Sequence, residues 1–126
     1  MKTEYGANTE HAGGTRYSEG KPSPMWTPAL GVLEVAKVTE YGAQKYAPHD
    51  WWSGQSYSTL VGSASRHVLR MLCYGPLSRD KESGLLHAAH AAWNLLCLLH
   101  FHNEGRDKEL DDLTKWVGKV TGEVAL

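Results

Sequence analysis

The segment from Ser83 to His102, SGLLHAAHAAWNLLCLLHFH, constrains the fold more than any other part of the chain. Most of its residues are apolar, as in a helix that is buried on nearly every side. His87, His90 and Asn94 interrupt the pattern at spacings of three and four, so they share one face of the expected helix, and Ser83 extends this stripe by one turn. The stripe either consists of core polar groups that bond to backbone or buried water, or it lines a cleft and contacts a ligand or a metal ion.

The rest of the chain predicts an all-α fold. Strand signals are weak, and helical patterns of apolar residues follow one another. The four expected helices run from 28 to 42 or 46, from about 56 to 74, from an N-cap at Asp80 or Ser83 to 102, and from about 107 to 120. We therefore predict a four-helix bundle in a single helical domain over residues 28–126, preceded by an irregular N-terminal arm over residues 1–27.

Composition limits the partners that the chain can have. Its 126 residues carry a net charge of −1, which gives no reason to expect a nucleic-acid polymer or an anionic membrane as the main partner, although a local cationic cluster could still hold a small anion. Polar residues inside the most apolar segment argue against a membrane span. Both cysteines lie in apolar helical patterns and fit a cytoplasmic protein, and the apolar third helix is best buried in a homodimer or larger homo-oligomer.

Charged residues near the stripe could complete a binding site. Arg66 and His67 lie in the middle of the second helix. They either occupy the surface or form a cationic wall opposite the stripe, where the planar guanidinium suits phosphate oxygens. Asp80 and Glu82 either cap the third helix or join His87 as ligands of a divalent cation.

Aromatic residues gather in the stretch EYGAQKYAPHDWW, which interleaves Tyr41, Tyr46, Trp51 and Trp52 with Lys45. Rings beside a cation suit a stacked nucleobase with attached phosphates. Such rings are more often core or interface packing, so this stretch favours a nucleotide only together with the other groups.

Five motifs in one order carry a family resemblance: RYSEGKP, ALGVLEVAKVTEYGAQKY, HDWWSGQSY, the Arg66–His67 pair and RDKESGLLHAAHAAWN. Over about residues 14–103 the chain resembles the N-terminal domain family of dATP/dGTP diphosphohydrolases, found largely in bacteriophages. The resemblance implies a relationship to MazG-like nucleotide pyrophosphohydrolases, which hold divalent cations with helix-borne carboxylates. A MazG-type site typically contains an ExxE pair followed by an ExxD pair, and the ExxE pair is absent from this chain. The matching positions are Lys21, Lys45, Tyr46, Trp51, Arg66, His67, Asp80, Ser83, Gly84, His87, His90 and Asn94.

The resemblance and the residues together predict a metal-dependent diphosphohydrolase that converts dGTP or dATP to the monophosphate and pyrophosphate in the host cytoplasm. Mg²⁺ or Mn²⁺ would be held by Asp80, Glu82 and Glu34, and His87 or His90 would act as general base or acid. The other predicted substrate contacts are Lys21, Lys45, Arg66 and His67 for phosphates, with Tyr46, Trp51, Ser83 and Asn94 elsewhere in the site. The alternative is a non-catalytic protein that sequesters a nucleotide-derived signalling molecule.

Overall fold

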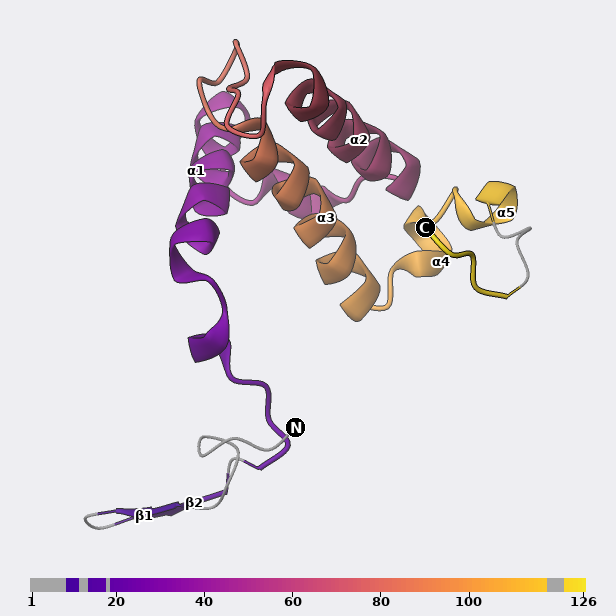
Figure 1. Cartoon of the computed structure of the whole chain (residues 1–126). Helices are drawn as coiled ribbons and strands as arrows, with labels where there is room; N and C mark the ends of the chain where they lie inside the picture. The colour runs from indigo at the N-terminus through magenta and orange to yellow at the C-terminus, as the bar shows by residue number, and fades with distance from the viewer. Residues whose placement is uncertain (1–8, 12–13, 18, 118–121) are drawn as a thin grey trace. The chain divides into compact units, whose positions relative to one another are not determined.

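The computed structural model describes residues 9–11, 14–17, 19–117 and 122–126, and it is mostly helical (Figure 1). The all-α prediction is therefore confirmed. The chain divides into two compact units, residues 1–32 and 33–126, with the division inside the first long helix. Within the described ranges, no helix combines the length and the hydropathy that a membrane-spanning segment requires.

The N-terminal unit contains a short hairpin that the weak strand signals of the sequence did not predict. β1 (Thr9–His11) pairs antiparallel with β2 (Gly14–Arg16), with Thr9 opposite Arg16. A short 3₁₀ helix, η2 (Pro24–Trp26), precedes α1 (Ala29–Lys45), and the Pro28 carbonyl accepts the first hydrogen bond of α1 from the Val32 backbone N–H. The remainder of the predicted arm, residues 1–8, 12, 13 and 18, lies outside the described residues.

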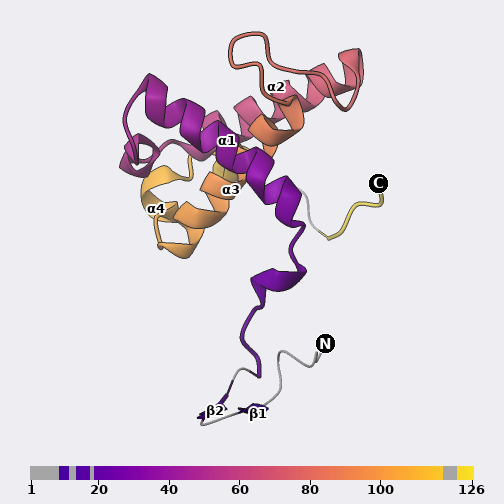
Figure 2. The ribbon, with the colours of Figure 1, turned by 90° about the vertical axis from the view of Figure 1, so that its left-hand side faces the viewer.

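The first two long helices agree with their predicted ranges. α1 ends at Lys45, and a short 3₁₀ helix, η3 (Asp50–Ser53), leads to α2 (Tyr57–Tyr74). The Ser56 hydroxyl caps α2 by accepting from the Thr59 backbone N–H at 3.4 Å. Gly75 ends the helix at a φ of 107°, which favours glycine. α2 lies beside α3 (His87–Asn103), and this helix pair forms the centre of the unit (Figures 1 and 2).

The predicted start of the third helix is wrong. α3 begins at His87 with Leu86 as its N-cap, so neither Asp80 nor Ser83 caps it. Instead the Asp80 carboxylate accepts from the Ser83 backbone N–H at 2.9 Å, and Arg79 pairs with Leu86 in an isolated β-bridge. Residues 75–86 therefore form a loop with its own hydrogen bonds, and we call this segment the 75–86 loop.

The predicted fourth long helix is also wrong, so the four-helix bundle is not confirmed. Two single-turn helices, α4 (Asp107–Leu110) and α5 (Thr114–Val117), replace it. The Asp111 carboxylate accepts from the backbone N–H groups of Leu113 and Thr114, both at 3.0 Å, and this local bonding competes with continuation of the helix. Residues 118–120 of the prediction lie outside the described residues.

The hydrophobic core lies between α2, α3 and α4. Leu60 and Phe101 are fully buried, and they pack with Tyr57, Cys97 and Leu110. The Tyr57 hydroxyl donates to the Asp107 carboxylate at 2.6 Å, which joins α2 to α4 at the edge of the core. Burial and this bond raise the pKa of Tyr57 to about 12, so the phenol stays protonated at neutral pH.

Gly54→Ala is expected to destabilise the fold more than Gly75→Ala. Both glycines have nearly the same backbone angles, with φ of 106° and 107° and ψ of 150° and 157°, so alanine is strained at each by about 1–3 kcal/mol. A Cβ at Gly54 would also lie 2.5 Å from Arg106 Nη2 and 3.2 Å from Leu110 Cδ2, whereas a Cβ at Gly75 meets nothing within 4 Å. Urea denaturation of both variants would measure the difference, and equal midpoints would contradict the Arg106 contact.

Candidate functional site

Three imidazole rings from two helices lie together. His67 on α2 stacks on His90 of α3 with ring centroids 4.6 Å apart and an interplanar angle of 9°. His67 Nδ1 also forms a hydrogen bond of 2.8 Å with Nδ1 of His87, which is 3% exposed. The polar stripe of α3 therefore meets His67 of α2, and the three rings define what we call the histidine cluster.

His90 is also linked to the 75–86 loop. Its Nε2 lies 2.7 Å from Ser83 Oγ, and Ser83 Oγ donates to Asp80 Oδ2 at 3.1 Å. Because the hydroxyl proton is directed to the carboxylate, Nε2–H of His90 can donate to Ser83 Oγ, which leaves Nδ1 as the basic nitrogen. Asp80, Ser83 and His90 thus form a chain that orients one imidazole.

The electrostatics around Asp80, Ser83 and His90 favour an ionised carboxylate beside neutral imidazoles. Burial would raise the pKa of Asp80, but the bonds from Ser83 and the nearby His90 and His67 lower it below the ordinary value. Burial lowers the pKa of His67, and the neighbouring rings of His90 and His87 lower it further. Burial also lowers the pKa of His90. Because their pKa values are lowered, His67 and His90 are neutral near neutral pH.

A large cleft opens beside the histidine cluster. Its volume is about 1030 Å³, at the top of the range typical of small-molecule sites. The C-terminal half of α1 forms one side of it, and residues 46–51 and α3 form others. The lining includes basic and aromatic side chains as well as the polar stripe: Tyr41, Lys45, Tyr46, His49, Trp51, His90, Trp93 and Asn94. The cleft can therefore offer a cation, several rings and an imidazole to one ligand.

The 75–86 loop reaches the cleft through Glu82. Its carboxylate accepts from Lys45 Nζ at 2.5 Å and from the Tyr41 hydroxyl at 2.8 Å. The hydrogen bond from Lys45 lowers the pKa of Glu82, and the bond to Glu82 raises the pKa of Lys45. Both groups are charged at neutral pH, and the ammonium retains further donors for a phosphate.

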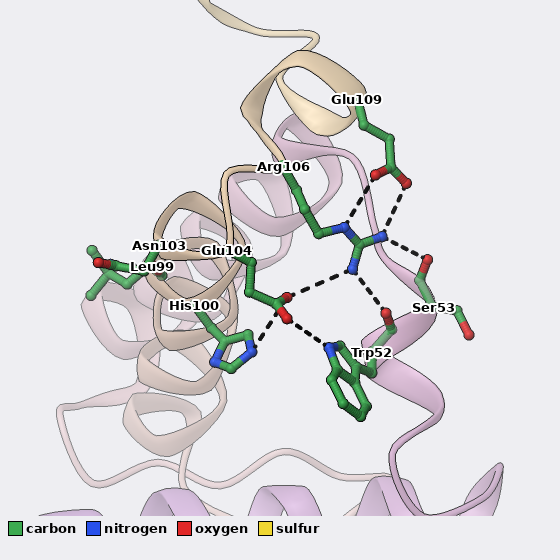
Figure 3. A network of polar contacts seen from close by, with 8 residues as sticks. All are labelled: Trp52, Ser53, Leu99, His100, Asn103, Glu104, Arg106 and Glu109. Carbon is green, nitrogen blue, oxygen red and sulfur yellow. Dashed lines mark hydrogen bonds and ion pairs between the residues drawn. The ribbon is translucent and has the colours of Figure 1, made fainter.

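Arg106 holds Trp52 and Ser53, which follow directly on the cleft-lining residues 46–51 (Figure 3). Its guanidinium donates to the backbone carbonyls of Trp52 at 2.9 Å and Ser53 at 3.1 Å, and it pairs with Glu109 at 3.0 Å. The Trp52 indole N–H donates to Glu104 at 3.0 Å. This network fixes η3, and with it the position of Trp51 in the cleft.

Comparison with known proteins identifies the family of the chain. The family model described as "dATP/dGTP diphosphohydrolase, N-terminal" matches residues 11–112. The chain belongs to this family. A relative from Salmonella phage PMBT28, named "dATP/dGTP diphosphohydrolase", is 33% identical over 110 residues, which are 86% of this chain and 36% of the relative. The chain thus spans about a third of the length of that relative. No solved structure matches the chain.

Several of the substrate contacts predicted from the sequence lie in or beside the cleft. The residues that line the cleft are Lys45, Tyr46, Trp51 and Asn94. Ser83 lies in the 75–86 loop rather than in a helix, and it contacts the lining residue His90. Asn94 is buried, and its amide N–H donates to the His90 carbonyl at 2.9 Å. The roles of these residues stay predictions, now with a common location.

One predicted phosphate contact does not line the cleft, and another belongs to the N-terminal unit. Arg66 is exposed on α2 and is not among the residues lining the cleft, because its side chain runs along its own helix toward Gly62. Lys21 belongs to the N-terminal unit. Both remain predictions. The two members of the Arg66–His67 pair diverge because successive residues of a helix point about 100° apart.

The three predicted metal ligands do not form one group. Glu34 pairs with Lys37 at 2.7 Å and lies seven residues before Tyr41, about 10 Å along the helix axis from the residue that binds Glu82. Glu82 is engaged by Lys45 and Tyr41. Only Asp80 lies with other groups able to bind an ion, and these are His67 and His87. The sequence predicted that Asp80 and Glu82 join His87 as metal ligands. In the structure Asp80 lies in one group with His87, and Glu82 is not part of that group.

Two carboxylate pairs nearer the C-terminus have the ExxD spacing, and the predictions from sequence omitted them. The two pairs are Glu104–Asp107 and Glu109–Asp112, and their side chains bond to other parts of the protein. Asp107 accepts from Tyr57, Glu109 pairs with Arg106, and Asp112 accepts from the Ser58 hydroxyl at 2.6 Å. These three carboxylates are engaged by structural partners, so the two pairs do not form a second candidate site.

Sequence reasoning noted Tyr41 in the aromatic stretch without assigning it to the site, and it missed Trp93 and His49. Tyr41 and Trp93 line the cleft, and the Trp93 indole N–H donates to Thr39 Oγ1 at 3.0 Å, which joins α3 to α1. His49 lines the cleft in a left-handed conformation with a φ of 62°, which is uncommon for a residue other than glycine. The available signal for Trp93 was its place next to Asn94, whereas nothing local indicated His49.

Acidification is expected to destabilise the protein through the histidine cluster. His67 and His90 have lowered pKa values in the folded state, whereas both take up a proton at an ordinary histidine pKa of about 6.5 when unfolded. The unfolded state then binds more protons around and below that value, so stability starts to fall as the pH drops below about 7.5 and keeps falling until the pH passes the lowered folded-state pKa values. Melting temperatures measured over a series of pH values in the presence of EDTA would test this. The double variant His67→Gln/His90→Gln should show a weaker dependence of melting temperature on pH. An unchanged profile in that variant would assign the acid sensitivity to other groups.

Proposed function

We propose that the chain is a nucleotide diphosphohydrolase that converts dGTP or dATP to the deoxynucleoside monophosphate and pyrophosphate in phage nucleotide metabolism. Water would attack the α-phosphorus, and the bond from this phosphorus to the oxygen bridging to the β-phosphate would break. Pyrophosphate would leave, and the proton of the attacking water would go to an imidazole. The family and the name of the phage relative support this activity.

The observation that carries the proposal is the Asp80–Ser83–His90 chain at the edge of the cleft. An imidazole that is neutral, oriented through Nε2 and basic at Nδ1 has the properties of a general base for water. His90 lines the cleft, so a bound substrate would lie beside it. His87 is buried against His67 and is better placed to support the cluster than to meet the substrate.

Substrate binding would use the cationic and aromatic parts of the cleft. Lys45 is the lysine of the lining, and it would bind phosphate oxygens while Glu82 holds it in place. Tyr46, Trp51 and Trp93 offer rings on which a purine could stack, and the Asn94 amide could read its edge.

A divalent cation, Mg²⁺ or Mn²⁺, would supply charge neutralisation of the triphosphate and polarisation of the attacking water. Asp80 and Glu82 on the 75–86 loop are the predicted carboxylates nearest the histidine cluster and Lys45, respectively. The chain's own residues would hold the phosphates, orient His90 and accept the proton.

Incubation of the purified chain with each of the four dNTPs and Mg²⁺ or Mn²⁺ tests the proposal. We expect equal amounts of pyrophosphate and monophosphate from dGTP or dATP, and less from the pyrimidine dNTPs. Release of inorganic phosphate instead would contradict the bond assignment. Tight binding of dGTP without any product would contradict the catalytic function.

The non-catalytic alternative, a protein that sequesters a nucleotide-derived signalling molecule, receives no support from the family or the phage relative. It makes a distinct prediction in the same assay. An intact nucleotide that co-purifies with the chain and is recovered unchanged after denaturation would favour it over hydrolysis.

A homo-oligomer is also proposed, because α3 carries an apolar face on the side away from the polar stripe. Leu95, Leu96 and Leu99 are 46%, 54% and 55% exposed, and Ala92 lies among them at helical spacing. Burial of such a face in a second copy would remove apolar surface from water. Light scattering should give at least twice the chain mass of 13.9 kDa, and Leu96→Glu should lower it. A wild-type monomer would contradict the assembly.

A further inference from the structure

We propose that His67, Asp80 and His87 form a binding site for one divalent transition-metal ion. One ligand atom from each residue lies within 4.8 Å of the other two. Among the described residues, this is the group of histidine, cysteine and acidic side chains that is compact enough to hold an ion. It shares only Asp80 with the three carboxylates predicted from the sequence.

The two imidazoles already aim their Nδ1 atoms at a common point. These atoms are 2.8 Å apart, so at most one of them carries a proton and the two lone-pair directions converge. Metal–nitrogen bonds of about 2.0–2.1 Å place two nitrogens on a tetrahedral ion about 3.3 Å apart. A small rotation of the half-buried His67 ring would therefore replace the shared proton by a cation.

Each ligand is held from outside the group. The His87 backbone N–H donates to the Ser78 carbonyl at 3.0 Å, and the His67 ring is supported by stacking on His90. Ser83 donates both its backbone N–H and its hydroxyl to Oδ2 of Asp80, which leaves Oδ1 available to an ion. Supporting contacts of this kind are what orient ligands in protein metal sites.

The chemistry of the group selects the class of metal. Two imidazoles and a single carboxylate suit Zn²⁺, Mn²⁺ or Co²⁺, whereas Mg²⁺ prefers an all-oxygen shell. These three residues are therefore a poor match for the carboxylate cluster that the resemblance to MazG-like enzymes implies for Mg²⁺. Three protein ligands also leave at least one position open for water, as in catalytic rather than structural sites.

The position of the group relates it to the cleft. His90 lines the cleft and stacks on His67, which does not line it. The proposed ion would therefore lie directly behind the imidazole that we assign as the base. Metal binding itself does not depend on nucleotide hydrolysis, because all three ligands belong to the chain.

Titration of the chelator-treated full chain with Co²⁺, without nucleotide, tests the proposal. We expect visible d–d absorption bands that saturate at one ion per chain, and displacement of Co²⁺ by Zn²⁺ but not by millimolar Mg²⁺. His67→Gln and Asp80→Asn should each weaken Co²⁺ binding at least tenfold. The amide oxygen introduced by Asp80→Asn can still accept the Ser83 hydrogen bonds, so the 75–86 loop should keep its fold in that variant, and circular dichroism would check it.

The matched control is His100→Gln, which removes an exposed imidazole from the same helix and should bind Co²⁺ like the wild type. Absence of saturable binding, or equal weakening by all three variants, would overturn the site. Because the Co²⁺ titration contains no nucleotide, its failure would not contradict the proposed nucleotide hydrolysis. Conversely, a chain that binds Co²⁺ at these residues but releases no pyrophosphate would keep the metal site and lose the proposed function.

Discussion

Replacing Phe101 by alanine is expected to lower the free energy of unfolding by about 3–5 kcal/mol. The ring is 0% exposed and lies in the core with Leu60, Cys97 and Leu110. Its removal would leave a cavity that the surrounding helices fill only in part. Since domains of this size are stable by about 5–15 kcal/mol, the variant should unfold at a much lower urea concentration.

The same substitution should also loosen the cleft. The Arg106 guanidinium lies over the Phe101 ring at 5.0 Å from its centroid, and the Trp51 ring is 6.0 Å away. Because Arg106 holds Trp52 and Ser53, loss of the ring would weaken the support of η3 as well as the core. We therefore expect nucleotide binding to weaken even under conditions in which the variant is folded.

Tyr74→Ala is the matched control for Phe101→Ala. Tyr74 is also aromatic, but it is the last residue of α2 and is 77% exposed, so its removal should cost less than about 1 kcal/mol. Urea curves with equal slopes would allow direct comparison of the two midpoints. Equal losses in the two variants would show that the Phe101 ring does not carry the core.

The ends of α1 and α2 could be predicted because the residues that set them act locally. Pro28 precedes the first turn of α1, Ser56 caps α2, and Gly75 adopts a conformation that ends it. Asp80 and Ser83 are equally good caps by residue type, yet they bond to each other and build a loop instead. Asp111 similarly captures backbone N–H groups that a longer helix would need. Sequence patterns do not decide between such competing local bonds.

The candidate site could be predicted where it depends on helix periodicity. The spacing of His87, His90 and Asn94 placed them on one face, and His67 on the facing helix meets that face. The contact of Lys45 with Glu82 joins residues 37 positions apart, so only the folded chain reveals it. The same holds for Asp80 beside His67 and His87, because the loop that brings it there does not follow from any periodic pattern.

His90→Gln is expected to lower kcat/KM for dGTP or dATP by about 10²–10⁴, the usual contribution of a general base. Glutamine is close in size and can still donate to Ser83 Oγ, so the loss would report the missing basic nitrogen rather than a collapsed site. Burial lowers the pKa of His90, so the neutral base persists to a lower pH than an ordinary histidine allows. Wild-type activity should therefore decline only as the pH falls through that lowered pKa, below about 6.5.

Ser83→Ala separates positioning from proton transfer. It removes the hydroxyl that links His90 to Asp80 but keeps the imidazole, so kcat should fall about tenfold with little change in KM, and the acid limb of the pH profile should shift. His102→Gln, an exposed imidazole on the same helix that does not line the cleft, should leave kcat and KM unchanged. If His90→Gln retained wild-type kcat/KM, the base would have to be another group, and the neutral, oriented imidazole at the cleft would serve only to support the histidine cluster.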